Sequence, residues 1–172
     1  MAAAAEQMPV PTTTSQTFVL EAFFARQLIA LLTPGTDEEV VFLTGPKLGS
    51  IRVVCRCAAP VALERQSAVF VRASARSVAD VLIPIIEQGG ELHMIAHSHP
   101  GMGPGATNPS STDVECLGKL QSNGSQCIGC ICTRSGHVRF FSVSTVFQVL
   151  LVGTGVTEVD PNVFHVPIED QD

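Results

Sequence analysis

Two histidines one residue apart stand before a loop rich in glycine and proline, and a Ser-x-x-Asp sequence follows that loop. His97 and His99 come first, then the ten residues 100–109, then Ser110 and Asp113. Side chains two apart on a strand point to the same face, so both imidazoles can reach one point. Catalytic zinc takes three protein ligands of this kind and leaves a further position open. The pattern therefore predicts a zinc site made by His97, His99 and Asp113.

A helix start is expected to bring Asp113 to the histidines. Ser110 or Ser111 can act as the N-cap, which places Asp113 in the first turn. The loop 100–109 lacks bulky side chains, so it can fold back and bring the strand and the helix together. Taken alone, Ser followed by Asp three residues later is an ordinary capping pattern, and a single His-x-His is common in strands. The combination in this order is what favours a metal.

The six cysteines offer a second place to look for a metal. Cys127 and Cys130 have the spacing of half a zinc knuckle, but the only partner pair is Cys55-Arg56-Cys57, whose spacing is unusual for such a site. The segment CIGCIC alternates like a buried strand, and a free cysteine packs as a small hydrophobic residue. We therefore interpret these cysteines as core residues. A nucleotide deaminase is excluded, because it needs His-x-Glu and Pro-Cys-x-x-Cys, which the sequence lacks.

The elements around the motif alternate between helices and strands without a regular βαβ order. Apolar spacing predicts helices and β-branched runs predict strands, and Pro84 predicts a kink or an early end of the second helix. The expected fold class is α/β of the α+β type, with a largely antiparallel mixed sheet sandwiched by helices. The expected helices are 17–32, 76–88 and 111–121, and the expected strands are 40–44, 51–58, 67–73, 92–96, 126–133, 137–143 and an edge strand at 162–168.

Composition limits the classes of partner. The chain has 172 residues, 45% of them hydrophobic, which suits one folded domain at 17–172 after a disordered lead-in at 1–16. A net charge of −6 argues against binding to nucleic acid, whose phosphates attract Lys and Arg. No apolar run is long enough to span a membrane, and no positive charge precedes the N-terminal alanines as in a secretory signal. We expect a cytoplasmic protein with reduced thiols.

The histidine and Ser-x-x-Asp motifs together resemble the signature of the JAMM (MPN+) metalloproteases, the zinc isopeptidases that remove ubiquitin and ubiquitin-like proteins. The order of elements is similar from about residue 17 to residue 143, which implies the MPN fold. The loop after His99 is longer than in most eukaryotic deubiquitinases of the family. Bacterial members encoded beside E1-like and E2-like proteins, including those of antiphage operons, resemble the sequence better.

The resemblance also implies a catalytic glutamate upstream of the histidines. In the family this glutamate comes seven residues before the glycine that ends an early strand, and in DEEVVFLTG that count from Gly45 reaches Glu38. Glu39 is the alternative, since one residue of shift would turn the side chain to the other face. Val41 stands where the family usually has a glycine, which departs from the pattern. Without the metal motif, these acidic residues would be interpreted as a solvated turn.

The resemblance gives each residue an expected role. Zn²⁺ held by His97, His99 and Asp113 would activate water, Glu38 would act as general acid and base, and Ser110 would stabilise the oxyanion. The substrate implied is a ubiquitin-like C-terminal tail joined to a lysine or to a following residue. Ubiquitin-like proteins, their conjugates and E1-like and E2-like proteins are the implied partners. The alternatives are a sulfur-carrier processing peptidase, a catalytically silent MPN scaffold and a member of a DNA-repair-associated branch.

Overall fold

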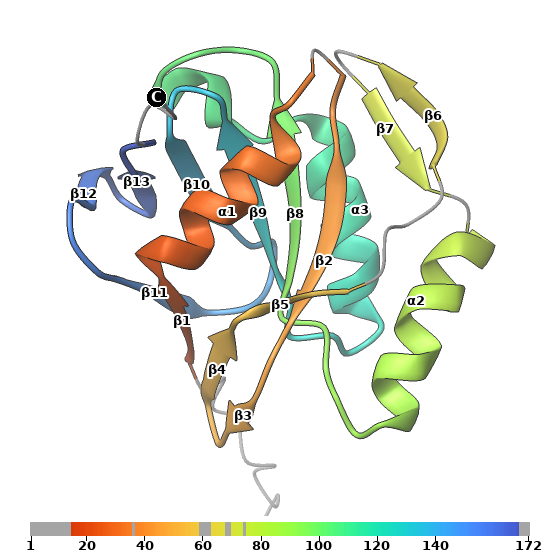
Figure 1. Cartoon of the computed structure of the whole chain (residues 1–172). Helices are drawn as coiled ribbons and strands as arrows, with labels where there is room; N and C mark the ends of the chain where they lie inside the picture. Colours follow the sequence, from red (N-terminus) through yellow and green to blue (C-terminus); the bar gives the residue numbers. More distant parts are fainter. Residues whose placement is uncertain (1–14, 36, 59–62, 68–69, 74, 169–172) are drawn as a thin grey trace, which may run out of the picture.

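The chain folds around a mixed β-sheet whose two faces are covered by different helices (Figure 1). The computed structural model describes residues 15–35, 37–58, 63–67, 70–73 and 75–168. Within them, the large sheet has the strand order β12-β13-β10-β9-β8-β2-β5, and only β8 and β9 run parallel. Its strands are β2 (Val40–Thr44), β5 (Arg56–Cys57), β8 (Met94–His99), β9 (Ile128–Thr133), β10 (His137–Phe141), β12 (Thr157–Asp160) and β13 (Val163–His165). The expected α+β class with a largely antiparallel sheet is confirmed.

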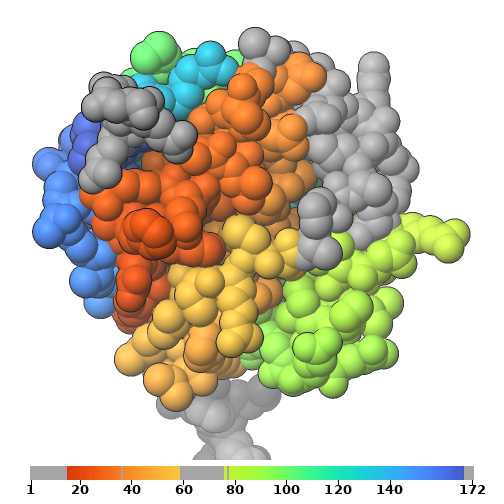
Figure 2. Space-filling model, in the orientation of Figure 1, coloured from red at the N-terminus to blue at the C-terminus, as the bar shows by residue number. Residues whose placement is uncertain are grey.

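Strand β8 shows how the sheet separates its two faces. Met94 and Ala96 are fully buried in the core that α1 (Ala22–Leu32) covers. Ile95 points the other way, into the core beneath α3 (Ser111–Ser122) and α2 (Ala75–Glu87). In the space-filling view, α1 hides the central strands on the face toward the viewer (Figure 2). Because His97 and His99 have the parity of Ile95, they lie on the α3 side.

A second sheet lies beside the first and has the order β11-β1-β4-β3. Its strands are β1 (Gln16–Glu21), β3 (Lys47–Leu48), β4 (Ile51–Val54) and β11 (Phe147–Val152). The central strand β1 is parallel to both of its neighbours, β4 and β11. A separate hairpin is formed by β6 (Leu63–Ser67) and β7 (Phe70–Ala73).

The prediction of one helix over residues 17–32 was wrong in its first part. Residues 16–21 form β1, and the helix begins only at Ala22. Phe18 and Leu20 are fully buried, while Thr17 and Val19 between them are partly exposed, which is the alternation of a strand. The strand is stabilised by β4 and β11, so tertiary pairing overrides the local helical pattern. Gln16 belongs to β1, and residues 1–14 of the expected lead-in lie outside the described residues.

Several other ranges differ in detail from the expectation. The strand expected at 51–58 is two strands, β4 and β5, which belong to different sheets. The strand expected at 162–168 is β13, and it lies between β10 and β12 rather than at the edge. Helix α2 continues past Pro84 to Glu87. The strand at 40–44, the helix beginning at Ser111 and the hairpin of β9 and β10 are confirmed. No helix in the described ranges has the length and apolarity needed to cross a bilayer.

Arg52 on β4 is a buried charge with few partners. Its side chain is 2% exposed, it donates to Gln16 Oε1, and its Nη2 lies 3.3 Å from Glu91 Oε2. Burial alone would raise the pKa of Glu91, but the hydrogen bond from Lys47 and the charges of Lys47 and Arg52 lower it below its ordinary value of 4.5. The resulting stabilisation is fully present above pH 4.5 and is lost as the pH falls through the lower pKa of the folded state.

We therefore expect Glu91→Gln to lower the free energy of unfolding at neutral pH by about 1 kcal/mol, because Arg52 loses its carboxylate partner. The effect stays small because the Glu91 side chain is 42% exposed and solvent screens the pair. Urea unfolding at several pH values measures it, and the difference from the wild type should shrink below pH 4.5. Lys47→Gln, which removes the more exposed partner, is the control with a smaller effect. A difference that does not change with pH would contradict this account.

Candidate metal centre

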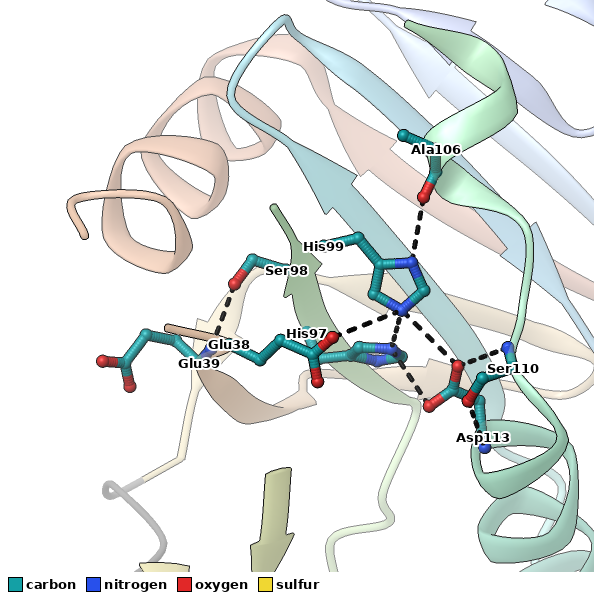
Figure 3. Close-up of polar contacts among 8 residues, drawn as sticks. All are labelled: Glu38, Glu39, His97, Ser98, His99, Ala106, Ser110 and Asp113. Carbon is teal, nitrogen blue, oxygen red and sulfur yellow. Dashed lines mark hydrogen bonds and ion pairs between the residues drawn. The ribbon is translucent and has the colours of Figure 1, made fainter. Parts of the chain in front are cut away.

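The last residues of β8 bring two imidazoles together (Figure 3). His97 and His99 lie on one face of the strand, and their Nε2 atoms are 3.1 Å apart. Both side chains are largely enclosed, with 7% and 15% of their surface exposed. The prediction that the two rings point to one place is confirmed.

Asp113 reaches the same place from the start of α3. Its Oδ1 lies 3.2 Å from His97 Nε2, and its Oδ2 lies 3.5 Å from His99 Nε2. A capping box fixes the carboxylate, since Ser110 N–H donates to Oδ2 at 2.7 Å and Asp113 N–H donates to Ser110 Oγ at 3.2 Å. The N-cap is thus Ser110 rather than Ser111. The capping pattern and the convergence on the histidines involve the same carboxylate.

The protonation of the cluster follows from its hydrogen bonds. His99 Nδ1 lies 2.9 Å from the carbonyl oxygen of Ala106, which can only accept, so Nδ1 carries a proton and donates it; in the neutral ring Nε2 then keeps its lone pair. Burial would lower the pKa of His99, but the protonated ring can donate hydrogen bonds to both Asp113 and Ala106, which raises the pKa above its ordinary value. Burial would raise the pKa of Asp113, and its hydrogen bonds with His97 and His99 hold it far below its ordinary value instead. Asp113 is therefore an anion aimed at two ring nitrogens.

The spacing of these atoms fits a tetrahedral zinc ion. Zinc bonds to nitrogen and oxygen of about 2.0–2.1 Å imply separations of roughly 3.3 Å between neighbouring ligand atoms. The three separations here are 3.1, 3.2 and 3.5 Å. In the part of the chain that the structure describes, one group of three or more His, Cys, Asp or Glu side chains lies close enough together to share an ion. It consists of His97, His99 and Asp113. Two imidazole nitrogens and one carboxylate oxygen also suit the chemistry of zinc.

Glu38 faces this cluster from the segment that leads into β2. The register pairs Val40 with His97, and Ser98 N–H donates to the Glu39 carbonyl, so Glu38 stands opposite His99. Residues opposite each other on antiparallel strands share a face. Glu38 Oε1 lies 4.0 Å from His99 Nε2, whereas the Glu39 carboxylate points away from the cluster (Figure 3). Of the two glutamates considered, Glu38 is the one placed at the site.

Glu38 lies in an environment that favours its protonated form. It is 8% exposed, and burial raises its pKa above the ordinary value, partly opposed by the charges of His99 and His97. A carboxyl group that exchanges its proton nearer neutrality is suited to general acid–base work. Ser110 is exposed, and its Oγ accepts one hydrogen bond at the start of α3, so the hydroxyl proton remains available to a ligand above the cluster.

An apolar cleft of about 560 Å³ begins at His97 and Asp113 and runs between α3 and the sheet. Sequence reasoning did not predict it, because its walls come from elements far apart in the chain. Its apolar lining includes Val40, Phe42, Ile95, Leu117, Leu120 and Phe141. Gly129 lies on its floor, where an added Cβ would be 2.2 Å from the Phe141 ring.

The other metal-ligand candidates are placed elsewhere. Cys127, Cys130 and Cys132 are fully buried in the core, as expected. Cys55 and Cys57 are exposed. His93 is also fully buried, and its Nε2 lies 2.8 Å from the carbonyl oxygen of Gly45, so it is a core residue.

Comparisons with known proteins add little about function. No family model matches the chain, and no curated relative is found. Among solved structures, the chain is similar to the solution structure of protein DSY2949 from Desulfitobacterium hafniense, with 17% sequence identity and a TM-score of 0.48. The similarity covers 78% of this chain and 94% of that chain. A likeness at this level supports no conclusion about activity.

Proposed function

We propose that this chain is a zinc-dependent peptidase of the JAMM (MPN+) type, which cleaves the bond after the C-terminal residue of ubiquitin or a ubiquitin-like protein. The observation that carries the proposal is the convergence of His97, His99 and Asp113, with Glu38 Oε1 4.0 Å from His99 Nε2. The order of these residues in the sequence and their meeting in space both agree with that class of hydrolase.

His97, His99 and Asp113 would hold the ion through two ring nitrogens and a carboxylate oxygen. Zinc, when bound, lowers the pKa of water toward neutrality and polarises a carbonyl group. The capping box at Ser110 and the carbonyl of Ala106 orient Asp113 and His99 before any ion binds. The protein therefore supplies a largely preformed set of donors.

Glu38 is the acid and base in this proposal. It accepts a proton from the water that attacks the scissile carbonyl and then donates that proton to the amine nitrogen that leaves. Its burial, which raises its pKa, makes both transfers feasible at one residue. Ser110 donates its hydroxyl hydrogen to the oxyanion, because its Oγ acts as acceptor for the Asp113 N–H at the start of α3 and keeps its own hydrogen to donate.

The substrate class comes from the resemblance, and the surface around the cluster is compatible with it. An extended tail needs a strand edge or a groove beside the reacting groups. The apolar cleft starts at two of the proposed ligands. The partners would be a ubiquitin-like protein and its conjugates, with E1-like and E2-like proteins in the same pathway. The setting we propose is an antiphage system in the bacterial cytoplasm. None of the six cysteines, all of which lie within the described residues, forms a disulfide, in keeping with a reducing compartment.

The direct test uses a fusion of a ubiquitin-like domain, taken from a neighbouring gene, to a reporter protein. We expect release of the free reporter, complete inhibition by a zinc chelator and recovery when zinc is added back, because the nucleophile is a water molecule rather than a thiol. Parallel fusions of ubiquitin and of a sulfur-carrier protein compare the candidate tails.

The control concerns Cys116, an exposed thiol three residues after Asp113 that lines the cleft. Cys116→Ser should keep its activity, and alkylation should not inhibit that variant. Zinc-loaded Cys116→Ser without activity would point to a cysteine peptidase. A wild type that binds zinc and cleaves none of the fusions would contradict the proposed substrate, and a wild type that binds no zinc would favour a silent scaffold.

A further inference from the structure

The loop between β8 and α3 directs one of its backbone carbonyls, that of Ala106, at His99. Residues Pro104–Thr107 form a short 3-10 turn, η1, closed by Ala106 N–H to Gly103 O at 3.3 Å. The carbonyl of Ala106 leaves this turn toward His99 Nδ1, at 2.9 Å. When Nδ1 carries the proton of the neutral ring, the lone pair is on Nε2, the nitrogen that faces Asp113. The position of η1 therefore bears directly on which nitrogen His99 offers to a ligand.

Thr107 and Arg139 fix η1 to the large sheet. Thr107 is fully buried, and its hydroxyl donates to the Pro104 carbonyl at 2.6 Å. The same oxygen accepts from Arg139 Nε at 3.1 Å. Arg139 belongs to β10 and is paired with Ile131 on one side and with Val163 on the other, so its backbone is held within the sheet.

Two further contacts limit the movement of the loop. Gly103 N–H donates to Ser135 Oγ, in the turn between β9 and β10, at 2.8 Å. Gly101 packs against Ala106, where an added Cβ would be 2.5 Å from the Ala106 Cβ. The 3-10 turn η1 of this loop lies against β9 and β10. These contacts hold in place the segment that carries the Ala106 carbonyl.

We infer that Thr107 and Arg139 are positioning residues, which hold the Ala106 carbonyl against His99 and so fix the His99 tautomer that presents Nε2 to zinc. Within the described part of the chain, Thr107 bonds to the backbone of η1 and Arg139 bonds to Thr107, so both act on His99 through the Ala106 carbonyl rather than by direct contact. The inference rests on the proposed zinc site for its consequence. The tautomer itself is a property of the protein without zinc.

The first measurement is made on the metal-free protein. Nitrogen-15 NMR of the His99 ring at alkaline pH reports which nitrogen carries the proton. We expect the Nδ1–H form in the wild type and in Thr107→Ser, which keeps the hydroxyl. Thr107→Val has nearly the same shape without the hydroxyl, and it should show a mixture of both tautomers. An unchanged Nδ1–H form in Thr107→Val would overturn the inference, whatever the protein does with zinc.

The second measurement is the affinity for Zn²⁺ alone, in competition with a chromophoric chelator. Loss of an outer hydrogen bond to a metal-ligating histidine typically weakens binding about 10- to 100-fold. We expect a loss of that size for Thr107→Val and for Arg139→Met, and near wild-type affinity for Thr107→Ser. The double variant should lose little more zinc affinity than either single variant, because both changes break the same series of contacts between Arg139 and the Ala106 carbonyl.

The outcomes separate this inference from the proposed function. If the wild type binds zinc and both single variants bind it equally well, the inference fails and the proposed function stands. If the wild type binds no zinc, the proposed function fails, and the NMR measurement still decides the tautomer. If Thr107→Val unfolds, Arg139→Met provides the same test. A variant that loses stability but keeps both the tautomer and the affinity would show a purely structural role.

Discussion

Glu38→Gln is expected to lower peptidase turnover at least about 100-fold while the zinc content stays at the wild-type level, since general acid–base groups typically contribute this much or more. The amide keeps the size of the side chain and cannot accept the proton of the attacking water. Glu38 does not belong to the three-residue ligand cluster, so the ion should remain bound. Turnover of the reporter fusion and elemental analysis of the same sample measure both quantities.

Glu39→Gln is the matched control, because Glu39 is the neighbouring carboxylate and points away from the cluster (Figure 3). It should retain most of the activity. If Glu39→Gln abolished turnover and Glu38→Gln did not, the structural assignment of the base would be wrong. If Glu38→Gln lost its zinc, Glu38 would be a ligand rather than a base.

The second large effect concerns the metal itself. We expect about one zinc per chain in the wild type and less than roughly a tenth of that in His97→Ala/His99→Ala, because Asp113 alone offers too few donors. Elemental analysis after exhaustive dialysis measures the content. His137→Ala/His165→Ala is a matched control, since these two rings also lie close together, with centroids 4.9 Å apart, and belong to no three-ligand cluster in the described part of the chain. Equal zinc in the two double variants would refute the proposed centre.

The elements that could be predicted from the sequence are those with a local signal. Residues 40–44 are β-branched and aromatic and end before a glycine, and they form β2. Ser110 and Asp113 carry the capping pattern of α3. The turn Arg134-Ser135-Gly136 separates β9 from β10, and Gly136 has the positive φ of 80° that such a turn needs. In each case neighbouring residues contain enough information.

The failures have a common physical reason, which is that distant partners decide the structure. Residues 16–21 have the apolar spacing of a helix, and they are a strand because β4 and β11 flank them. Residues 51–58 divide at Cys55, where the chain leaves one sheet for the other. Neither partner strand nor sheet membership can be deduced from the local pattern.

The candidate site shows the same division. The residue types and the parity of the histidines indicate the candidate ligands, but the choice between Glu38 and Glu39 is decided by the register of β2 on β8. A sequence motif cannot identify the carbonyl of Ala106 as a partner of His99, because every residue has a carbonyl and only the fold directs this one at His99. The apolar cleft depends on how α3 packs against the sheet.

The central position of β1 has a consequence for the order in which the molecule can be assembled. Phe18 is paired with Val149, roughly 130 residues away in the chain. Contacts that join such distant segments form late, because the intervening chain must first be closed into a loop. During synthesis, the histidines, the capped helix and the loop between them leave the ribosome before β11 does. The second sheet can be completed only when nearly the whole chain is present. Phe18 and Leu20 therefore spend a long interval without the residues that bury them in the finished core.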